Sequence, residues 1–229
     1  MKTILTSIVL AAAAIMPATA QKTKTLSNGY PFSQVPFTSV KIAHDSFWGN
    51  RLQAARKVTI PLAFSKCETE HRYKNFEMAA YTLQHPGHKG LDTKEWNVSK
   101  FMGFSFDDTD VYKTIEGASY ILQTYPDKKM KAYIDSVLNV VGAAQEPDGY
   151  LYTPRTAGKP GALHSWVGEK RWEKDPDLSH ELYNCGHLYE AAVAHFISTG
   201  KRSLLDIAIK NADLLVKDFL EGAQAASTM

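Results

Sequence analysis

The sequence predicts an all-α fold of antiparallel helical hairpins arranged as part of an α/α toroid. Apolar residues recur at spacings of three and four through most of residues 46–220. Very short links, residues 125–127 and 198–200, join successive helical segments and allow only antiparallel pairing. Long loops connect one pair to the next, which favours closure into a ring over an open solenoid.

Two helical segments precede the hairpins. Residues 46–65 form an apolar face, although Pro61 must bend or interrupt that helix, and residues 74–83 form a shorter helix. Residues 21–43 lack this periodicity and are expected to be an extended lead-in. We therefore place the partial barrel at residues 44–222, followed by an irregular tail at 223–229.

The hairpins themselves are predicted from two amphipathic pairs. Residues 108–124 pair with 128–144, and residues 182–198 pair with 203–220. The pairs also align loosely with each other, because Glu116 matches Glu190 at an offset of 74 residues and Lys128 matches Lys201 at an offset of 73. A helical-hairpin repeat is therefore the organising unit.

Composition and charge bound the class of protein. The chain has 229 residues, 44% of them hydrophobic and 22% charged, which is enough for one globular domain with a core. Its formal net charge is +2 and it has no long basic run. Nucleic acid is therefore not an expected partner.

Residues 1–20 resemble an export signal. A basic start at Lys2 is followed by the apolar run 8–16 and by a small-x-small cleavage motif, Ala18, Thr19 and Ala20. The residue after that motif is Gln21, not the cysteine of a lipoprotein. We expect a mature chain of about 209 residues that is secreted or periplasmic and has no membrane segment after cleavage.

Two cysteines, Cys67 and Cys185, stand 118 residues apart, so a disulfide is allowed but not implied. Cys185 has helical spacing from Leu188 and Ala192, as expected of a small buried apolar residue. A metal site made of Cys185 and His187 is disfavoured, because residues two apart on a helix point to different faces.

Polar and aromatic residues concentrate between residues 144 and 195, where the backbone changes direction. Pro147, Asp148 and Gly149 are typical of a turn, and residues 150–153 alternate as a short strand would. About 25 residues of loop follow before the next helix, and connections of that length are usually functional. We therefore expect a binding surface in this loop, which contains His164, Trp166, Arg171 and Trp172.

In an α/α toroid the inner helices start at one end, so their N-termini converge on one mouth. The loop end at residues 179–181 and the acidic stretch at residues 107–110 would meet there. Asp107 and Asp108 are equally explained as helix N-caps. Asp110, Tyr112, Tyr183 and His187 fall inside the first helical turns, where capping does not account for them.

Four strings carry a family resemblance: SFWGNRL, DTDVYKTIEGASY, AQEPDGYLYT and SHELYNCGHLYEAAVAHFISTGKRSLLDIAIKNADLL. Together they resemble the N-terminal half of the catalytic domain of the glycoside hydrolase family 127 β-L-arabinofuranosidases, over residues 42–219. The resemblance implies an (α/α)6 barrel with a furanose pocket, followed by β-rich domains. It also implies retaining hydrolysis by a zinc-held cysteine nucleophile, with glutamate and cysteine metal ligands and a glutamate acid/base.

The sequence departs from that family pattern in one respect. The family's catalytic and zinc-binding positions belong to the second half of the barrel, and this sequence has no adjacent cysteine pair. We therefore expect no catalytic residue, metal ligand or cofactor within this chain, although zinc is expected in a full-length relative. The chain is predicted to be an incomplete and inactive fragment.

Only substrate-side residues carry over from the resemblance. His187 resembles the family's sugar-contacting histidine, and its neutral imidazole can both donate and accept hydrogen bonds. Each carried residue either contacts an arabinose-containing oligosaccharide or positions the loop. The candidate substrate-binding set is His187, His180, Glu181, Tyr183, Asp148 and Tyr150, with Asp110 added from the predicted mouth and Trp166 from the long loop.

Two alternative functions remain open. An α/α-toroid hydrolase or lyase could use paired carboxylates, for which Asp110, Asp148 and Glu181 are the candidates. A non-catalytic sugar-binding module would use the aromatic residues near the long loop. In either case a partial ring would leave apolar helical faces open, which predicts self-association.

Overall fold

The structure is a computed structural model that describes residues 32, 35–86, 103–157 and 165–221, and this part of the chain contains helices but no strand. Contacts divide the chain into two compact units, Met1–Phe37 and Thr38–Met229. A short 3-10 helix, η1, covers Phe37–Ser39. The predicted signal peptide, most of the lead-in and the 223–229 tail lie outside the described residues.

The second unit begins with a continuous helical run. It comprises α1 (Phe47–Ala54), the π-helical turn η2 (Ala55–Thr59) and α2 (Ile60–Thr69). Ser46 caps α1, since its hydroxyl accepts from the Gly49 N–H at 3.0 Å. Pro61 lies in the first turn of α2, directly after η2, so the predicted interruption is confirmed: proline lacks the N–H that a regular helix needs there.

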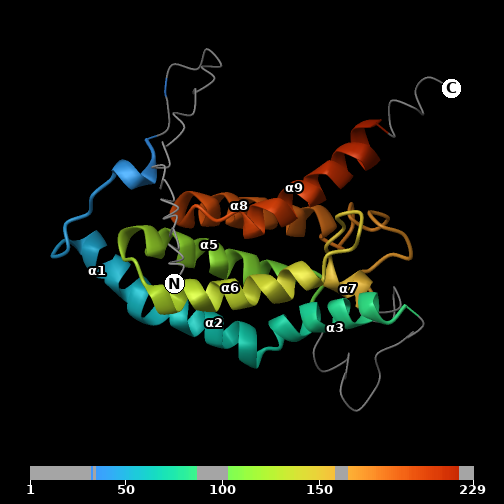
Figure 1. Cartoon of the computed structure of the whole chain (residues 1–229), viewed down its shortest axis with the longest axis horizontal. Coiled ribbons are helices and arrows are strands. Elements are labelled where there is room, and N and C mark those ends of the chain that lie inside the picture. The colour runs from blue at the N-terminus through green and yellow to red at the C-terminus, as the bar shows by residue number, and fades with distance from the viewer. Residues whose placement is uncertain (1–31, 33–34, 87–102, 158–164, 222–229) are drawn as a thin grey trace, which may run out of the picture. The chain divides into compact units, whose positions relative to one another are not determined.

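Helix α3 (Arg72–Gln84) follows α2 with a bend instead of folding back beside it (Figure 1). The bend lies at His71, whose φ of 62° is left-handed and breaks the helical path. The predicted helix at residues 74–83 is thus confirmed, two residues longer at its start.

Both predicted hairpins are confirmed. Helices α5 (Asp108–Thr124) and α6 (Lys128–Ala143) form the first. Helices α8 (Glu181–Thr199) and α9 (Ser203–Leu215) form the second, with α9 continuing as the π-helical turn η3 (Val216–Glu221). Asp127 caps α6 by accepting from the N–H groups of Lys129 and Met130, and Gly200 ends α8 with a φ of 72°.

The core lies between these helices. Helix α5 packs along α8, while α6 packs against α3, α5 and α9 (Figure 1). Residues spaced by three and four fill the space between them, as the amphipathic pattern requires. The largest enclosed aliphatic and aromatic side chains include Phe76, Met78, Ile115, Leu122, Ile134, Leu188 and Leu204.

The short strand expected at residues 150–153 is not formed. Thr153 instead begins a single helical turn, α7 (Thr153–Thr156), and the preceding Tyr152 has extended backbone angles. Tyr150, Leu151 and Tyr152 are all buried, so the alternation in the sequence does not correspond to one solvent-exposed face and one buried face. The segment has no neighbouring strand to pair with among the described residues.

Apolar side chains remain exposed along the helices at both edges of this unit. On α8, α9 and η3 they include Val193, Phe196, Ile197, Ile209, Val216 and Phe219, and on the first helical run they include Phe47, Trp48, Val58 and Leu62. Within the described residues no helix is both long and apolar enough to span a membrane.

Candidate functional site

The starts of α5 and α8 lie together, as the toroid prediction requires. The Ser105 hydroxyl donates to the carbonyl of Leu178 at 2.9 Å, and the Asn184 amide donates to the carbonyl of Ser105 at 3.3 Å. These bonds join the segment before α5 to the loop before α8 and to the first turn of α8. The two inner helices therefore open at one mouth, although their first turns are separated by more than 70 residues of sequence.

Asp107 and Asp108 stand at this mouth but do not cap their own helix. Asp107 accepts from the N–H groups of Gly103 and Phe104 and forms a 2.9 Å ion pair with Arg72. Asp108 accepts from both the N–H and the hydroxyl of Thr153, at 2.8 and 2.6 Å. Burial raises the pKa of Asp108 to about 7. The capping interpretation is thus wrong: both carboxylates hold neighbouring segments in place.

Glu181 is an anchor for the long loop. Its carboxylate accepts from the Tyr150 hydroxyl at 2.7 Å, from the Trp172 N–H at 3.0 Å and from the Ser179 hydroxyl at 3.2 Å. Only 1% of Glu181 is exposed, and burial raises the pKa of its carboxyl group. Tyr150 is also fully buried. Of the two roles considered for these residues, sugar contact and positioning of the loop, this geometry supports positioning of the loop.

Asp148 belongs to a clasp formed by Arg171. The guanidinium binds Asp148 and also Glu146, whose Oε2 lies 2.6 Å from Nη2, and it stacks 4.2 Å from the centre of the Tyr150 ring. Hydrogen bonding to Arg171 lowers the pKa of Asp148. The turn at residues 147–149 is thereby tied to the loop that follows it. Asp148 is therefore engaged within the protein, as Glu181 is.

A chain of aromatic and imidazole rings occupies the mouth; we call it the ring cluster. The Trp166 and His180 ring centres are 6.3 Å apart, those of His180 and Tyr183 are 5.7 Å apart, and those of Tyr183 and His187 are 4.6 Å apart. Phe104 and Phe106 stack on each other and extend the chain beside Trp166 and His180. The members of the ring cluster are Phe104, Phe106, Trp166, His180, Tyr183 and His187.

Polar groups flank the ring cluster. Lys113 of α5 donates to the Tyr183 hydroxyl at 2.7 Å, and its ammonium lies 4.8 Å from the centre of that ring. Sites that bind small ligands combine such rings with a few placed polar groups. The arrangement can therefore present both C–H-binding faces and hydrogen-bonding groups to a sugar.

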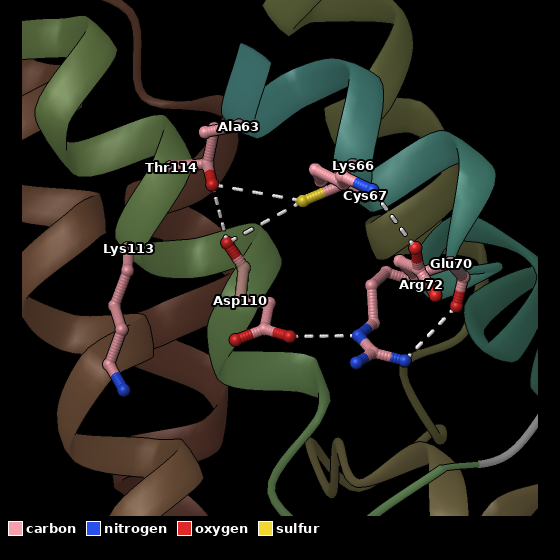
Figure 2. Close-up of a pocket in the computed structure, with 8 residues that line it drawn as sticks. All are labelled: Ala63, Lys66, Cys67, Glu70, Arg72, Asp110, Lys113 and Thr114. Atoms are coloured by element: carbon pink, nitrogen blue, oxygen red, sulfur yellow. Dashed lines mark hydrogen bonds and ion pairs between the residues drawn. The ribbon is translucent and has the colours of Figure 1, made fainter. Parts of the chain in front are cut away.

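A cavity of about 310 Å³ lies between α2 and α5 and shares Lys113 with this surface. Figure 2 shows Asp110 and Arg72 meeting at one edge of this cavity, joined by a 2.8 Å hydrogen bond from Nε to Oδ2. Cys67 lies at the other side, where its thiol contacts Thr114 and the carbonyl of Asp110. Asp110 is thus placed at the cavity wall and not within the ring cluster.

The structure divides the predicted site residues into two groups. His180, His187, Tyr183 and Trp166 meet in the ring cluster, whereas Asp148, Tyr150 and Glu181 hold the loop, and Asp110 pairs with Arg72. Sequence reasoning missed Phe104, Phe106 and Lys113. The alternation of aromatic residues in FMGFSFDD was the available signal for the first two.

The two cysteines do not suit the zinc centre that the family resemblance implies. Cys67 contacts Thr114, whereas Cys185 lies beside Asn211 and Tyr189, and burial raises the pKa of Cys185 to about 12. Both are buried, free thiols in separate environments. A zinc–thiolate site needs deprotonated cysteines that converge on the metal, so these residues do not fit one.

Comparison with known proteins gives consistent matches. The profile described as "Beta-L-arabinofuranosidase, GH127 catalytic domain" matches residues 39–228. A curated non-reducing end beta-L-arabinofuranosidase of Bifidobacterium longum subsp. longum is 41% identical over 120 residues, which cover 52% of this chain and 18% of that protein.

Two solved structures are similar as well. A GH127 beta-arabinofuranosidase superposes with a TM-score of 0.71 at 59% identity, covering 82% of this chain and 27% of its own. A GH127 beta-L-arabinofuranosidase from Geobacillus stearothermophilus T6 superposes with a TM-score of 0.61 at 36% identity, covering 76% of this chain and 25% of its own. The chain therefore spans between 18% and 27% of the length of these relatives.

Proposed function

This chain belongs to the glycoside hydrolase family 127 β-L-arabinofuranosidases, and from that premise we propose that it supplies the sugar-binding side of such an enzyme's barrel. Its helices form part of the family's (α/α)6 barrel. The proposed substrate class is arabinose-containing plant glycans. The zinc-held cysteine and the acid/base glutamate would come from outside this chain.

The ring cluster is the observation that carries the proposal. It lies where α5 and α8 start, and it combines exposed ring faces with the imidazoles of His180 and His187. Sugar rings present C–H groups that suit aromatic faces, and their hydroxyls can donate to and accept from a neutral imidazole. A furanose seated on Tyr183 would therefore have His187 within the same contact surface.

Binding tests this role without requiring turnover. Calorimetric titration of the chain with an arabinofuranose oligosaccharide is expected to give saturable binding, which Tyr183→Ala and Trp166→Ala each weaken about tenfold, equivalent to about 1.4 kcal/mol. Trp48→Ala, an exposed tryptophan on α1, is the matched control and should leave affinity unchanged. Equal affinity in all variants would remove the ring cluster from the proposal.

Turnover separates the proposed role from the alternatives. We expect the pure chain to release no arabinose from an aryl arabinofuranoside, because the family's zinc-held cysteine and acid/base glutamate are not expected among its residues. Turnover that is abolished by Asp148→Asn with Glu181→Gln would instead favour the paired-carboxylate hydrolase. Glu181 is buried and fully bonded, which supports the first outcome.

Export and self-association complete the proposal. Residues 1–20 would direct secretion or export to the periplasm, so N-terminal sequencing of the exported protein should begin at Gln21. The exposed apolar faces at the edges of the helical unit would drive association between copies. Sedimentation should show oligomers that Val193→Lys with Ile197→Lys shifts toward monomer, whereas Ser136→Lys on α6 should not.

A further inference from the structure

Three side chains of the types that bind metal ions meet between α5 and α8. They are Glu116 of α5 and His187 and Glu190 of α8, whose ligand atoms all lie within 4.8 Å of one another. One of them, His187, also belongs to the ring cluster. His187 and Glu190 are three residues apart and so share one helix face. Glu116 and Glu190 are also the positions that align between the two hairpin repeats.

The charges of this group are not balanced within the described residues. No lysine or arginine of the described chain lies within ion-pair distance of Glu116 or Glu190. Glu116 instead accepts a hydrogen bond from the Tyr120 hydroxyl. Two carboxylates at this separation repel each other, and a bound cation would relieve that repulsion.

The imidazole of His187 supplies an independent observation. Its Nδ1 atom is buried and makes no hydrogen bond with the described residues, although Glu190 Oε2 is only 3.2 Å away. The distance is short but the ring nitrogen is not directed for hydrogen bonding. A buried nitrogen that approaches a carboxylate without bonding to it is well placed to share a metal ion with that carboxylate.

We propose that Glu116, His187 and Glu190 bind one divalent transition-metal ion. One imidazole and two carboxylates match the ligand preferences of zinc, whereas calcium and magnesium prefer sites made of oxygen alone. Zinc binds its ligands at about 2 Å, so the three ligand atoms must move closer together than their present spacing to bind one ion. The 62% exposed Glu190 side chain has the freedom to do so, and Tyr120 would orient Glu116.

This site differs in chemistry from the cysteine-containing zinc centre implied by the family resemblance. It uses no thiolate, so cobalt(II) can distinguish the two. Cobalt(II) bound by nitrogen and oxygen ligands gives weak visible bands, whereas cobalt(II) bound to cysteine adds an intense thiolate charge-transfer band. The visible spectrum therefore reports which residues hold the ion.

The chain would be titrated with Co²⁺ by visible absorption and with Zn²⁺ by calorimetry. The expected result is one equivalent bound, without a thiolate band, and an affinity that falls at least about tenfold in Glu116→Gln, Glu190→Gln and His187→Gln. Glu77→Gln on α3, whose glutamate pairs with Lys74, is the matched control and should bind as the parent does. Circular dichroism would verify that each variant remains helical.

Three outcomes would overturn the inference: no saturable binding, binding unchanged in Glu116→Gln, or a thiolate charge-transfer band. Glu116→Gln also keeps the metal and sugar proposals separate. That variant should lose metal affinity while it retains affinity for the arabinofuranose oligosaccharide, because Glu116 is not a member of the ring cluster.

Discussion

The Tyr150 hydroxyl donates a 2.7 Å hydrogen bond to Glu181, and both residues are enclosed in the protein. The bond joins the turn after α6 to the first residue of α8. It therefore sets the direction in which α8 leaves the loop, and with it the positions of Tyr183 and His187. Loop anchoring and ring placement are thus coupled through a pair of buried residues.

Tyr150→Phe tests that coupling. Removing the hydroxyl deprives a buried carboxylate of one donor, and we expect a loss of about 1–3 kcal/mol in the free energy of unfolding. Glu181→Gln should cost a similar amount, while the double variant should cost clearly less than the sum of the two. Urea denaturation of all four proteins measures the cycle, and strict additivity would contradict the proposed coupling.

Asp108 should make stability fall as the pH rises. Its pKa in the folded chain is about 7, above the unfolded value of 3.8, because burial disfavours the charged form. The folded state therefore retains the proton between these values, so its stabilising contribution is complete below pH 3.8 and lost as pH rises through 7. With about 1.4 kcal/mol per pKa unit, the full effect is on the order of 4 kcal/mol.

Asp108→Asn provides the reference for that measurement, since an amide keeps the side-chain shape but does not titrate. Thermal unfolding of both proteins between pH 4 and pH 8 should show the parent losing stability relative to Asp108→Asn across this window. Parallel curves would mean that Asp108 has the same pKa in the folded and unfolded chain.

The Arg171 clasp predicts a contrast between two arginines. Arg171→Met removes a partly buried guanidinium that binds Glu146 and Asp148 and covers Tyr150, and we expect a loss of about 2–3 kcal/mol. Arg202→Met removes an exposed pair with Asp206 on α9, for which we expect at most about 1 kcal/mol. Denaturation at two salt concentrations should show that only the Arg202 effect is strongly screened.

Two glycines are expected to respond to alanine with opposite signs. Gly149 has a φ of 103°, and an added Cβ would lie 2.2 Å from the carbonyl oxygen of Lys210, so Gly149→Ala must displace α9 or the turn. Gly186 lies inside α8, and an added Cβ would have no atom within 4 Å apart from its chain neighbours and the backbone of its own helix, so Gly186→Ala should stabilise the helix by about 1 kcal/mol. Melting temperatures that move in the same direction would contradict one of these assignments.

The sequence by itself determined the helices and their hairpin pairing. Apolar spacing, the Asp127 cap and the Gly200 stop are local signals, and the structure places α5, α6, α8 and α9 within a few residues of the predicted bounds. The interruption of the first helix at Pro61 is also a local effect, because it follows from the N–H that proline lacks. The four strings that resemble a known family indicated the fold and the expected substrate class, because a family resemblance can be recognised from sequence without knowledge of tertiary contacts.

Only the tertiary structure decided what each polar residue at the mouth does. Asp108, Glu181 and Asp148 have the residue types of capping or catalysis, yet their partners are Thr153, Tyr150 and Arg171, contributed by other segments. The same holds for Glu116, which meets His187 and Glu190 only because α5 and α8 pack side by side. Burial and hydrogen bonding depend on neighbours distant in sequence, so periodicity could place these side chains on helices but could not assign their partners.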